Sequence, residues 1–191
     1  KGVDIEIVVT PQSSQSADGT QTCVQEVRLA SPLVLDFSGQ KMIRTLPLVQ
    51  SNVAFDLNAD GRAEQVGWVD GHTAAFLVLD LNGNGIVDNG SELFGEATRL
   101  VQGNKIAEEG FAALAQYDSN NDHRIDAKDP IFSKLQLWFD ANGNGRTDAN
   151  ELVPLSKRGI SFISLESKAV PSAQSLQHLK SIPNEIRTQA V

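Results

Sequence analysis

Acidic and amide side chains recur at alternate positions in four short segments of this sequence. The clearest is 140–151, where oxygen-bearing side chains occupy positions 1, 3, 5, 9 and 12 and Gly145 occupies position 6. A hard cation such as Ca²⁺ takes about six to eight oxygen ligands, and a curled loop supplies them from alternate residues with a glycine at the sharp turn. The spacing therefore predicts a calcium loop of the EF-hand type. Its predicted ligands, including the backbone carbonyl of position 7, are Asp140, Asn142, Asn144, Arg146, Asp148 and Glu151.

Segment 118–129 repeats this pattern with two departures. His123 stands where glycine is expected, so a left-handed backbone there carries a steric penalty. The closing acid, Asp129, is one methylene shorter than glutamate, which shortens its reach toward a cation. The predicted ligands are Asp118, Asn120, Asp122, Arg124, Asp126 and Asp129.

The remaining two segments match less completely. In 80–92 the closing acid falls one residue late, which makes a thirteen-residue variant whose predicted ligands are Asp80, Asn82, Asn84, Ile86, Asp88 and Glu92. Segment 56–64 has only the front half of the pattern and an acid at position 9, with predicted ligands Asp56, Asn58, Asp60, Arg62 and Glu64. Position 12 of that segment would be Gly67, and Asp70 is a candidate for late closure. A single match could equally be an Asx-turn, but four matches favour three to four bound Ca²⁺ ions.

Composition narrows the class of protein. The chain has 191 residues and a formal charge of −8, and residues 52–151 contain 22 of its 26 Asp and Asn residues. An acidic chain without a Lys/Arg cluster argues against nucleic acid as a partner. The longest apolar run, 74–79, is too short for a transmembrane helix. The single cysteine, Cys23, excludes an internal disulfide.

The elements that must position these loops are predicted to be short. Apolar periodicity of 3.6 residues indicates one amphipathic helix at 106–117, and 91–100 is predicted as a second short helix. Alternating apolar residues predict strands at 3–9, 24–29, 33–37, 53–55, 66–68, 74–79, 135–139 and 160–165. The expected fold is α+β, with short strands and few short helices organised around two pairs of EF-hand-like calcium loops. Three regions are expected: an N-terminal β-hairpin segment at 1–30, a calcium-binding module at 31–167 and a C-terminal tail at 168–191.

Residues 32–166 resemble the self-processing module of Frp-type RTX (repeats-in-toxin) exoproteins and related EF-hand-like secreted modules. The matching stretches are SPLVLDF (31–37), VAFDLNADGRAEQVGWV (53–69), LVLDLNGNGIVDNGSELFGEAT (77–98), YDSNNDHRIDAKDPIFSKLQLWFDANGNGRTDANEL (117–152) and KRGISFISL (157–165). The resemblance implies that calcium folds the module and triggers cleavage of an Asp-Pro bond at its N-terminal edge. It also implies that the freed aspartyl group can pass to a lysine as an isopeptide link.

The reacting end departs from that family pattern. In the family's reaction the aspartate carboxylate attacks its own backbone carbonyl, whereas the corresponding dipeptide here is Ser31-Pro32. A serine hydroxyl cannot form the cyclic anhydride, and the Asp-rich loop that follows in the family is reduced to residues 36–40. One Asp-Pro bond remains, Asp129-Pro130, but its aspartate is predicted to close a calcium loop.

These observations predict a non-enzymatic calcium-binding module, secreted or held at a bacterial cell surface or in the periplasm. Its folding would depend on calcium, and its role would be structural or in binding an unidentified protein or cell-surface partner. The alternative is a self-processing module that retains Asp-Pro autocleavage or transpeptidation. Because Asn replaces Asp at position 3 of every loop, the expected affinities are those of extracellular modules, roughly 10⁻⁴–10⁻³ M.

Overall fold

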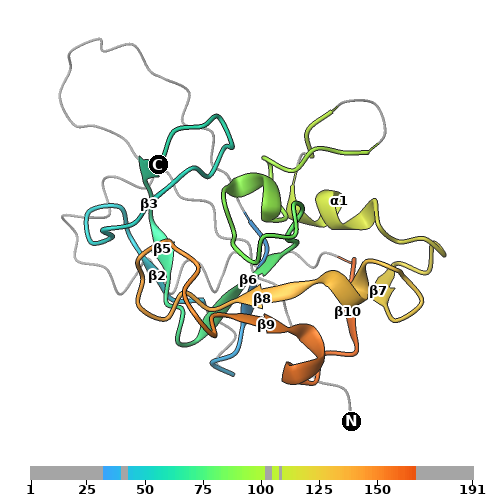
Figure 1. Cartoon of the computed structure of the whole chain (residues 1–191). Helices are drawn as coiled ribbons and strands as arrows, with labels where there is room; N and C mark the ends of the chain where they lie inside the picture. Colours follow the sequence, from blue (N-terminus) through green and yellow to red (C-terminus); the bar gives the residue numbers. More distant parts are fainter. Residues whose placement is uncertain (1–31, 40–42, 102–104, 108, 167–191) are drawn as a thin grey trace, which may run out of the picture. The chain divides into compact units, whose positions relative to one another are not determined.

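A four-stranded antiparallel sheet forms the centre of the described structure. The computed structural model describes residues 32–39, 43–101, 105–107 and 109–166, all within one compact unit. The sheet has the order β1-β6-β8-β9 (Figure 1). Its strands are Val34–Asp36, Ala74–Val78, Gln136–Trp138 and Leu152–Pro154. The register pairs Phe76 with Val34 on one side and with Trp138 on the other.

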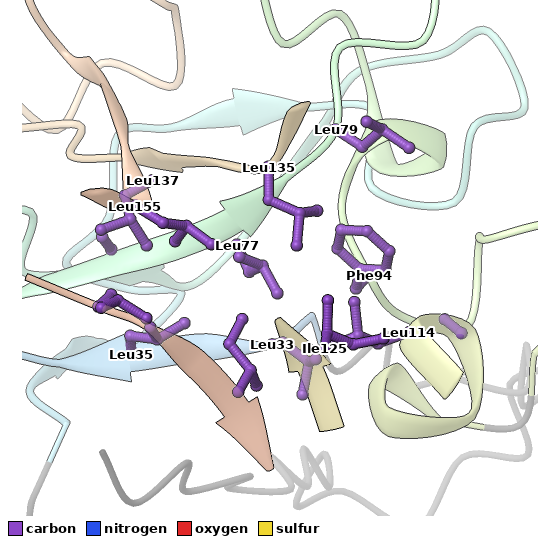
Figure 2. Close-up of a cluster of buried hydrophobic side chains, with 14 of the residues drawn as sticks. Leu33, Leu35, Leu77, Leu79, Phe94, Leu114, Ile125, Leu135, Leu137 and Leu155 are labelled. Carbon is purple, nitrogen blue, oxygen red and sulfur yellow. The ribbon is translucent and has the colours of Figure 1, made fainter. Parts of the chain in front are cut away.

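The two faces of this sheet bury different side chains. Successive residues of a strand point to opposite faces, and every residue of β6 is buried, so β6 contributes to two cores. Leu77 joins a leucine-rich cluster with Leu35 and Leu137, which we call the leucine cluster (Figure 2). Phe76 joins Phe55, Trp68 and Trp138 in a second core, which we call the aromatic cluster. The chain therefore has two hydrophobic supports on which loops can be mounted.

Shorter elements complete each side. Three two-stranded ladders pair β2 with β5, β3 with β4, and β7 with β10. The bounds of these strands are Thr45–Leu46, Ala54–Phe55, Glu64–Gln65, Trp68–Val69, Arg124–Asp126 and Phe162–Ser164. The helical elements are α1 and three 3₁₀ turns, η1 to η3, at Gly110–Ala115, Gly90–Glu92, Phe132–Lys134 and Leu155–Arg158. In Figure 2 leucines of the sheet meet Phe94, Leu114 and Ile125 in the leucine cluster.

The predicted α+β fold organised around EF-hand-like calcium loops is wrong. The described residues contain one α-helix, α1, of six residues, and otherwise small antiparallel sheets and 3₁₀ turns. None of the four loops lies between two α-helices in the described part of the chain. The physical reason lies in the flanking residues, because Leu77–Leu79 and Leu137–Phe139 bury both faces of a sheet and leave no helical stripe. Strands instead lead into three of the four loops: β3 precedes 56–64, β6 precedes 80–92 and β8 precedes 140–151.

The individual strand predictions fare better than the helix predictions. Strands predicted at 33–37, 53–55, 74–79, 135–139 and 160–165 correspond to β1, β3, β6, β8 and β10. The helix predicted at 91–100 is wrong, because only η1 forms and Leu93 bridges to Val78. The helix predicted at 106–117 begins at Gly110, because Ile106 pairs with Arg99. The predicted strands at 3–9 and 24–29, the segment 1–30 and the tail 168–191 lie outside the described residues.

Candidate metal loops

All four predicted loops share one unusual backbone conformation. Positions 4 and 6 have positive φ in each loop, within the left-handed region. The residues are Ala59, Gly61, Gly83, Gly85, Asn121, His123, Gly143 and Gly145. The left-handed conformation predicted for His123 is confirmed, with φ at 60°. Because single turns rarely reproduce two such positions, the loops are copies of one structural motif rather than unrelated turns.

The same hydrogen bonds hold each copy. The carboxylate at position 1 accepts the N–H groups of positions 5 and 6; in the last loop Asp140 accepts those of Asn144 at 3.1 Å and Gly145 at 2.7 Å. The position 3 side chain accepts the N–H of position 5, and the position 5 side chain accepts that of position 7. The other three loops repeat these contacts, with Asp56, Asp80 and Asp118 at position 1. The alternating oxygens thus curl the backbone toward one point.

A buried acid closes three of the four loops. Both oxygens of Glu151 are engaged, by the N–H of Ala141 at 3.1 Å and that of Asp148 at 3.0 Å. Glu92 accepts from the same two positions, 2 and 9, although it arrives one residue late, because η1 absorbs the extra residue. Asp129 also reaches both positions, at 2.8 Å to Ser119 and 3.0 Å to Asp126. The shorter side chain of Asp129 therefore makes the same closure as glutamate.

Loop 56–64 lacks this closure. Glu64 lies in β4, opposite Phe55, and its side chain is exposed. The carboxylate of Asp70, the candidate for late closure, accepts instead from the N–H of His72 at 3.1 Å and the hydroxyl of Thr73 at 3.3 Å. Asp70 thus belongs to the turn between β5 and β6, and loop 56–64 stays open on that side.

The side chains at positions 3, 5 and 9 also converge. In loop 140–151 the carboxylate of Asp148 accepts from Asn142 at 2.7 Å and Asn144 at 2.8 Å, and these two donors hold the pKa of that carboxyl below its usual range. In loop 80–92 Asp88 accepts from Asn82 and Asn84 at 2.8 Å each.

Two further loop acids have lowered pKa values: Asp80, at position 1 of loop 80–92, and Asp122, at position 5 of loop 118–129. The N–H of Gly85 is the largest influence on Asp80 and lowers its pKa. Hydrogen bonding from Lys128 does the same for Asp122, at 3.1 Å. These carboxyl groups therefore stay ionised, as metal ligands must be.

Four of the predicted ligands are buried carboxyl groups. The exposed fractions are 4% for Glu92, 1% for Asp129, 0% for Asp140 and 7% for Glu151. Burial alone would raise the pKa of Asp129, yet the hydrogen bonds from Asp126 and Ser119 outweigh that effect and hold it below its usual range. Within the described ranges the ion pairs involve Lys128 with Asp122 and Asp126, so none of the four buried acids forms an ion pair, although the charge of Lys128 also lowers the pKa of Asp129. Buried anions that form no ion pair are the donor chemistry that a cation fits.

Carboxylate, imidazole and thiol groups alone do not form a metal site in the described residues. Among the described residues no group of three or more His, Cys, Asp and Glu side chains is placed to hold a metal ion. The predicted ligand sets depend on Asn oxygens and on backbone carbonyls at Arg62, Ile86, Arg124 and Arg146, which such a group does not include.

Two tryptophans touch the ligands of loop 140–151. Both side chains are buried in the aromatic cluster. Their indole N–H groups, however, point at carboxylates: Trp68 donates to Asp140 at 2.6 Å and Trp138 to Glu151 at 3.4 Å. The position of Trp138 two residues before a loop was the available sign, whereas the contact from Trp68 spans 72 residues and has no local signature.

Comparisons with known proteins place this arrangement in context. The family model described as SPM domain matches residues 33–187. The chain is also similar to the iron-regulated protein FrpA of Neisseria meningitidis serogroup C, with 42% identity over 139 residues. That alignment covers 73% of this chain and 12% of the relative, so the chain spans about an eighth of the relative's length. In the described part of the chain no helix has the length and apolarity to cross a membrane.

Proposed function

The chain belongs to the SPM domain family, and we propose that it is a calcium-binding module of an FrpA-like RTX exoprotein whose folding depends on calcium. The observation that carries the proposal is the set of buried acids, Glu92, Asp129, Asp140 and Glu151, which accept from neutral hydrogen-bond donors and form no ion pair among the described residues. A cation at each loop would supply the missing positive charge.

The ligand sets fit calcium better than other common metals. Each loop offers carboxylate, amide and backbone oxygens but no thiolate, and His123 is the single imidazole within the four loops. Oxygen-only sites suit Ca²⁺ and Mg²⁺, and Mg²⁺ retains water rather than accepting an all-protein cage. In loops 80–92, 118–129 and 140–151 the ligands would be the position 1, 3, 5 and 9 side chains, the position 7 carbonyl and the closing acid. Loop 56–64 would use its front half only.

Electrostatics supports a folding role for calcium. The four loops hold 13 acidic residues, and four divalent ions would bring the formal charge from −8 to about zero. A metal that binds only the folded chain stabilises it by mass action. The melting temperature of the intact chain should therefore rise by several degrees between excess chelator and millimolar calcium, and less in magnesium. An unchanged melting temperature would refute the proposal.

The resemblance also carries a second function, autocleavage, and the position of β1 bears on it. Leu33, two residues after position 31, is held by its N–H to Phe94 at 2.8 Å and by its carbonyl to Leu77 at 3.0 Å. Leu33 is thus anchored close in sequence to the Ser31-Pro32 bond, but serine has no carboxylate to attack its own carbonyl. We propose that the scaffold is retained and that this activity is lost with Ser31.

The Ser31→Asp variant tests this second point. An aspartate carboxylate oxygen would attack its own backbone carbonyl carbon, the C–N bond to Pro32 would break, and the proline nitrogen would take up a proton. The cyclic anhydride would then be opened by water or by a lysine amine. We expect the native chain to keep its 20.6 kDa mass in millimolar calcium and the variant to cut slowly. Mass spectrometry showing native fragments that end at Ser31 would refute the loss of activity.

The remaining Asp-Pro bond is not proposed as a cleavage site. Both carboxylate oxygens of Asp129 are held by hydrogen bonds, and the residue is buried, so it is not free to attack its own carbonyl. Native fragments ending at Asp129 would contradict this assignment.

We further propose that the module acts outside the bacterial cytoplasm, where free calcium matches the expected affinity. It would be secreted, periplasmic or at the cell surface, and it would bind a protein or surface partner there.

A further inference from the structure

Loops 80–92 and 140–151 touch each other through a side chain. The N–H of Val87 donates to the hydroxyl of Thr147 at 2.9 Å, and both residues stand at position 8 of their loops. Val87 is buried and Thr147 half-buried, so water does not freely replace this bond. An unpaired buried N–H is costly, which makes the conformation of one loop depend on that of the other.

Loop 56–64 connects to the same two loops. The N–H of Gly90, near the end of loop 80–92, donates to the carbonyl of Asp56 at 2.8 Å. The approach is so close that a Cβ on Gly90 would lie 1.8 Å from the carbonyl oxygen of Leu57. On the other side, Trp68 follows loop 56–64 in the chain and donates to Asp140 at 2.6 Å.

Loop 118–129 stands apart from this network. It belongs to the leucine cluster through Ile125, and its β7 pairs with β10, beyond which the N–H of Leu165 donates to the carbonyl of His123 at 3.0 Å. Among the described residues none of its hydrogen bonds reaches another loop. The arrangement is therefore three loops and one, rather than the two pairs that sequence spacing predicts.

We propose that loops 56–64, 80–92 and 140–151 bind calcium as one coupled unit, with Thr147 and Trp68 as the positioning residues that connect them, while loop 118–129 binds independently. The inference rests on the proposed function. Thr147 touches no predicted ligand of loop 80–92 directly and acts through the backbone at Val87. Trp68 acts on Asp140 from a segment that lies between the first two loops. Coupling of this kind is reciprocal, because each bound ion favours the conformation that the others need.

The test follows each loop separately during a calcium titration of the full chain by ¹H–¹⁵N NMR. The amides of Gly61, Gly85, His123 and Gly145 each report their own loop, and Gly61 should share the midpoint of Gly85 and Gly145. In the native chain we expect Gly85 and Gly145 to share one midpoint and His123 to have another. Thr147→Val keeps the shape but removes the acceptor, so the midpoints of Gly85 and Gly145 should rise by about threefold or more while that of His123 stays within about twofold. Thr147→Ser restores the acceptor and should restore the native midpoints.

Trp68→Phe provides a second test that keeps the aromatic packing. It removes the indole donor to Asp140 and should raise the midpoints of Gly145 and Gly85 together, again without moving His123. Unchanged Gly85 and Gly145 midpoints in both variants, or a His123 midpoint that moves with them, would overturn the coupling. So would a Thr147→Val effect that Thr147→Ser fails to reverse. If no amide of the native chain responds to calcium, the proposed function itself fails and this inference with it.

Discussion

The two faces of the central sheet carry the same loop motif on different supports. On the aromatic side, loops 80–92 and 140–151 have glycine at both left-handed positions and touch each other through Val87 and Thr147. On the leucine side, loop 118–129 uses Asn121 and His123 at those positions, closes with an aspartate and carries its own lysine against position 5. The ligand spacing from position 1 to position 9 is the same in these loops, whereas the hydrophobic cluster that each loop packs against differs. The proposed coupling of loops 80–92 and 140–151 therefore rests on their shared support and their contact, rather than on ligand spacing.

The largest expected effect is a loss of folding stability on the aromatic side, caused by a substitution at Gly145. Its φ is +69°, and a Cβ there would lie 2.4 Å from the Val53 side chain, so Gly145→Ala should destabilise the chain by at least about 2 kcal/mol. Gly143→Ala is the matched control, because its φ of +63° is similar but no atom lies within 4 Å; it should cost about 1 kcal/mol. Urea unfolding measures both. Equal losses would mean that the contact between Gly145 and Val53 does not hold the loop.

The second effect compares closing acids on the two sides. Glu151→Gln removes one charge from a coupled loop and should weaken calcium binding about tenfold, across more than one site. Asp129→Asn removes the same charge from the independent loop and should affect a single site. Calorimetry resolves the number of sites changed, and Glu166→Gln, an exposed change outside the loops, serves as the control. The comparison fails if both closing variants alter one site each.

A smaller effect sharpens the leucine side through Lys128. Its ammonium group lies 3.1 Å from Asp122, which raises the pKa of Lys128 and places a positive charge where a cation would bind. Lys128→Gln should therefore strengthen calcium binding at loop 118–129 by about two- to fivefold, the range of an exposed ion pair. Lys134→Gln, at an exposed lysine of η2, should change nothing. Weaker binding after Lys128→Gln would show that the lysine supports the loop instead of competing with the ion.

The smallest expected effect is a gain in folding stability when glycine replaces Ala59 or His123, two non-glycine residues with left-handed backbone. His123→Gly and Ala59→Gly should each stabilise the chain by about 0.5 kcal/mol, because the relieved strain slightly exceeds the added entropy of glycine in the unfolded chain. Ala127→Gly, at an exposed turn residue without positive φ, should instead destabilise by a few tenths to about 1 kcal/mol. Thermal melting of the three variants decides the sign, and a loss at both left-handed sites would contradict the strain argument.

Sequence reasoning found the loops because their ligand pattern is local. The spacing of Asp140, Gly145 and Glu151 encodes a curl that needs no distant partner, and the left-handed φ at His123 followed from the same alignment. The strands β6 and β8 were predictable for a similar reason, since β6 is a run of buried apolar residues and β8 lies within the apolar alternation of Leu135, Leu137 and Phe139.

The features that the sequence did not predict depend mostly on contacts between residues that are distant in the chain. The predicted helix at 91–100 fails because Glu92 turns back to close its loop and Leu93 pairs with Val78. The strands β7 and β9 are three residues long and carry polar or proline residues, so no periodicity reveals them. The link between Val87 and Thr147 spans 60 residues and leaves no local pattern. For these reasons the expected helical framework was wrong, although the four segments share the curled backbone that their spacing indicates. Metal binding by these segments stays a prediction.

A calorimetric titration of the native chain with calcium, after chelator treatment, measures the proposed calcium binding itself. We expect three to four calcium ions per chain, with dissociation constants near 10⁻⁴–10⁻³ M for sites that act alone. Loop 118–129 should appear as a class of site distinct from the three coupled loops. No heat of binding, or one class of fully equivalent sites, would contradict the two-sided picture. Dissociation constants below about 10⁻⁷ M at every site would contradict the assignment to extracellular calcium.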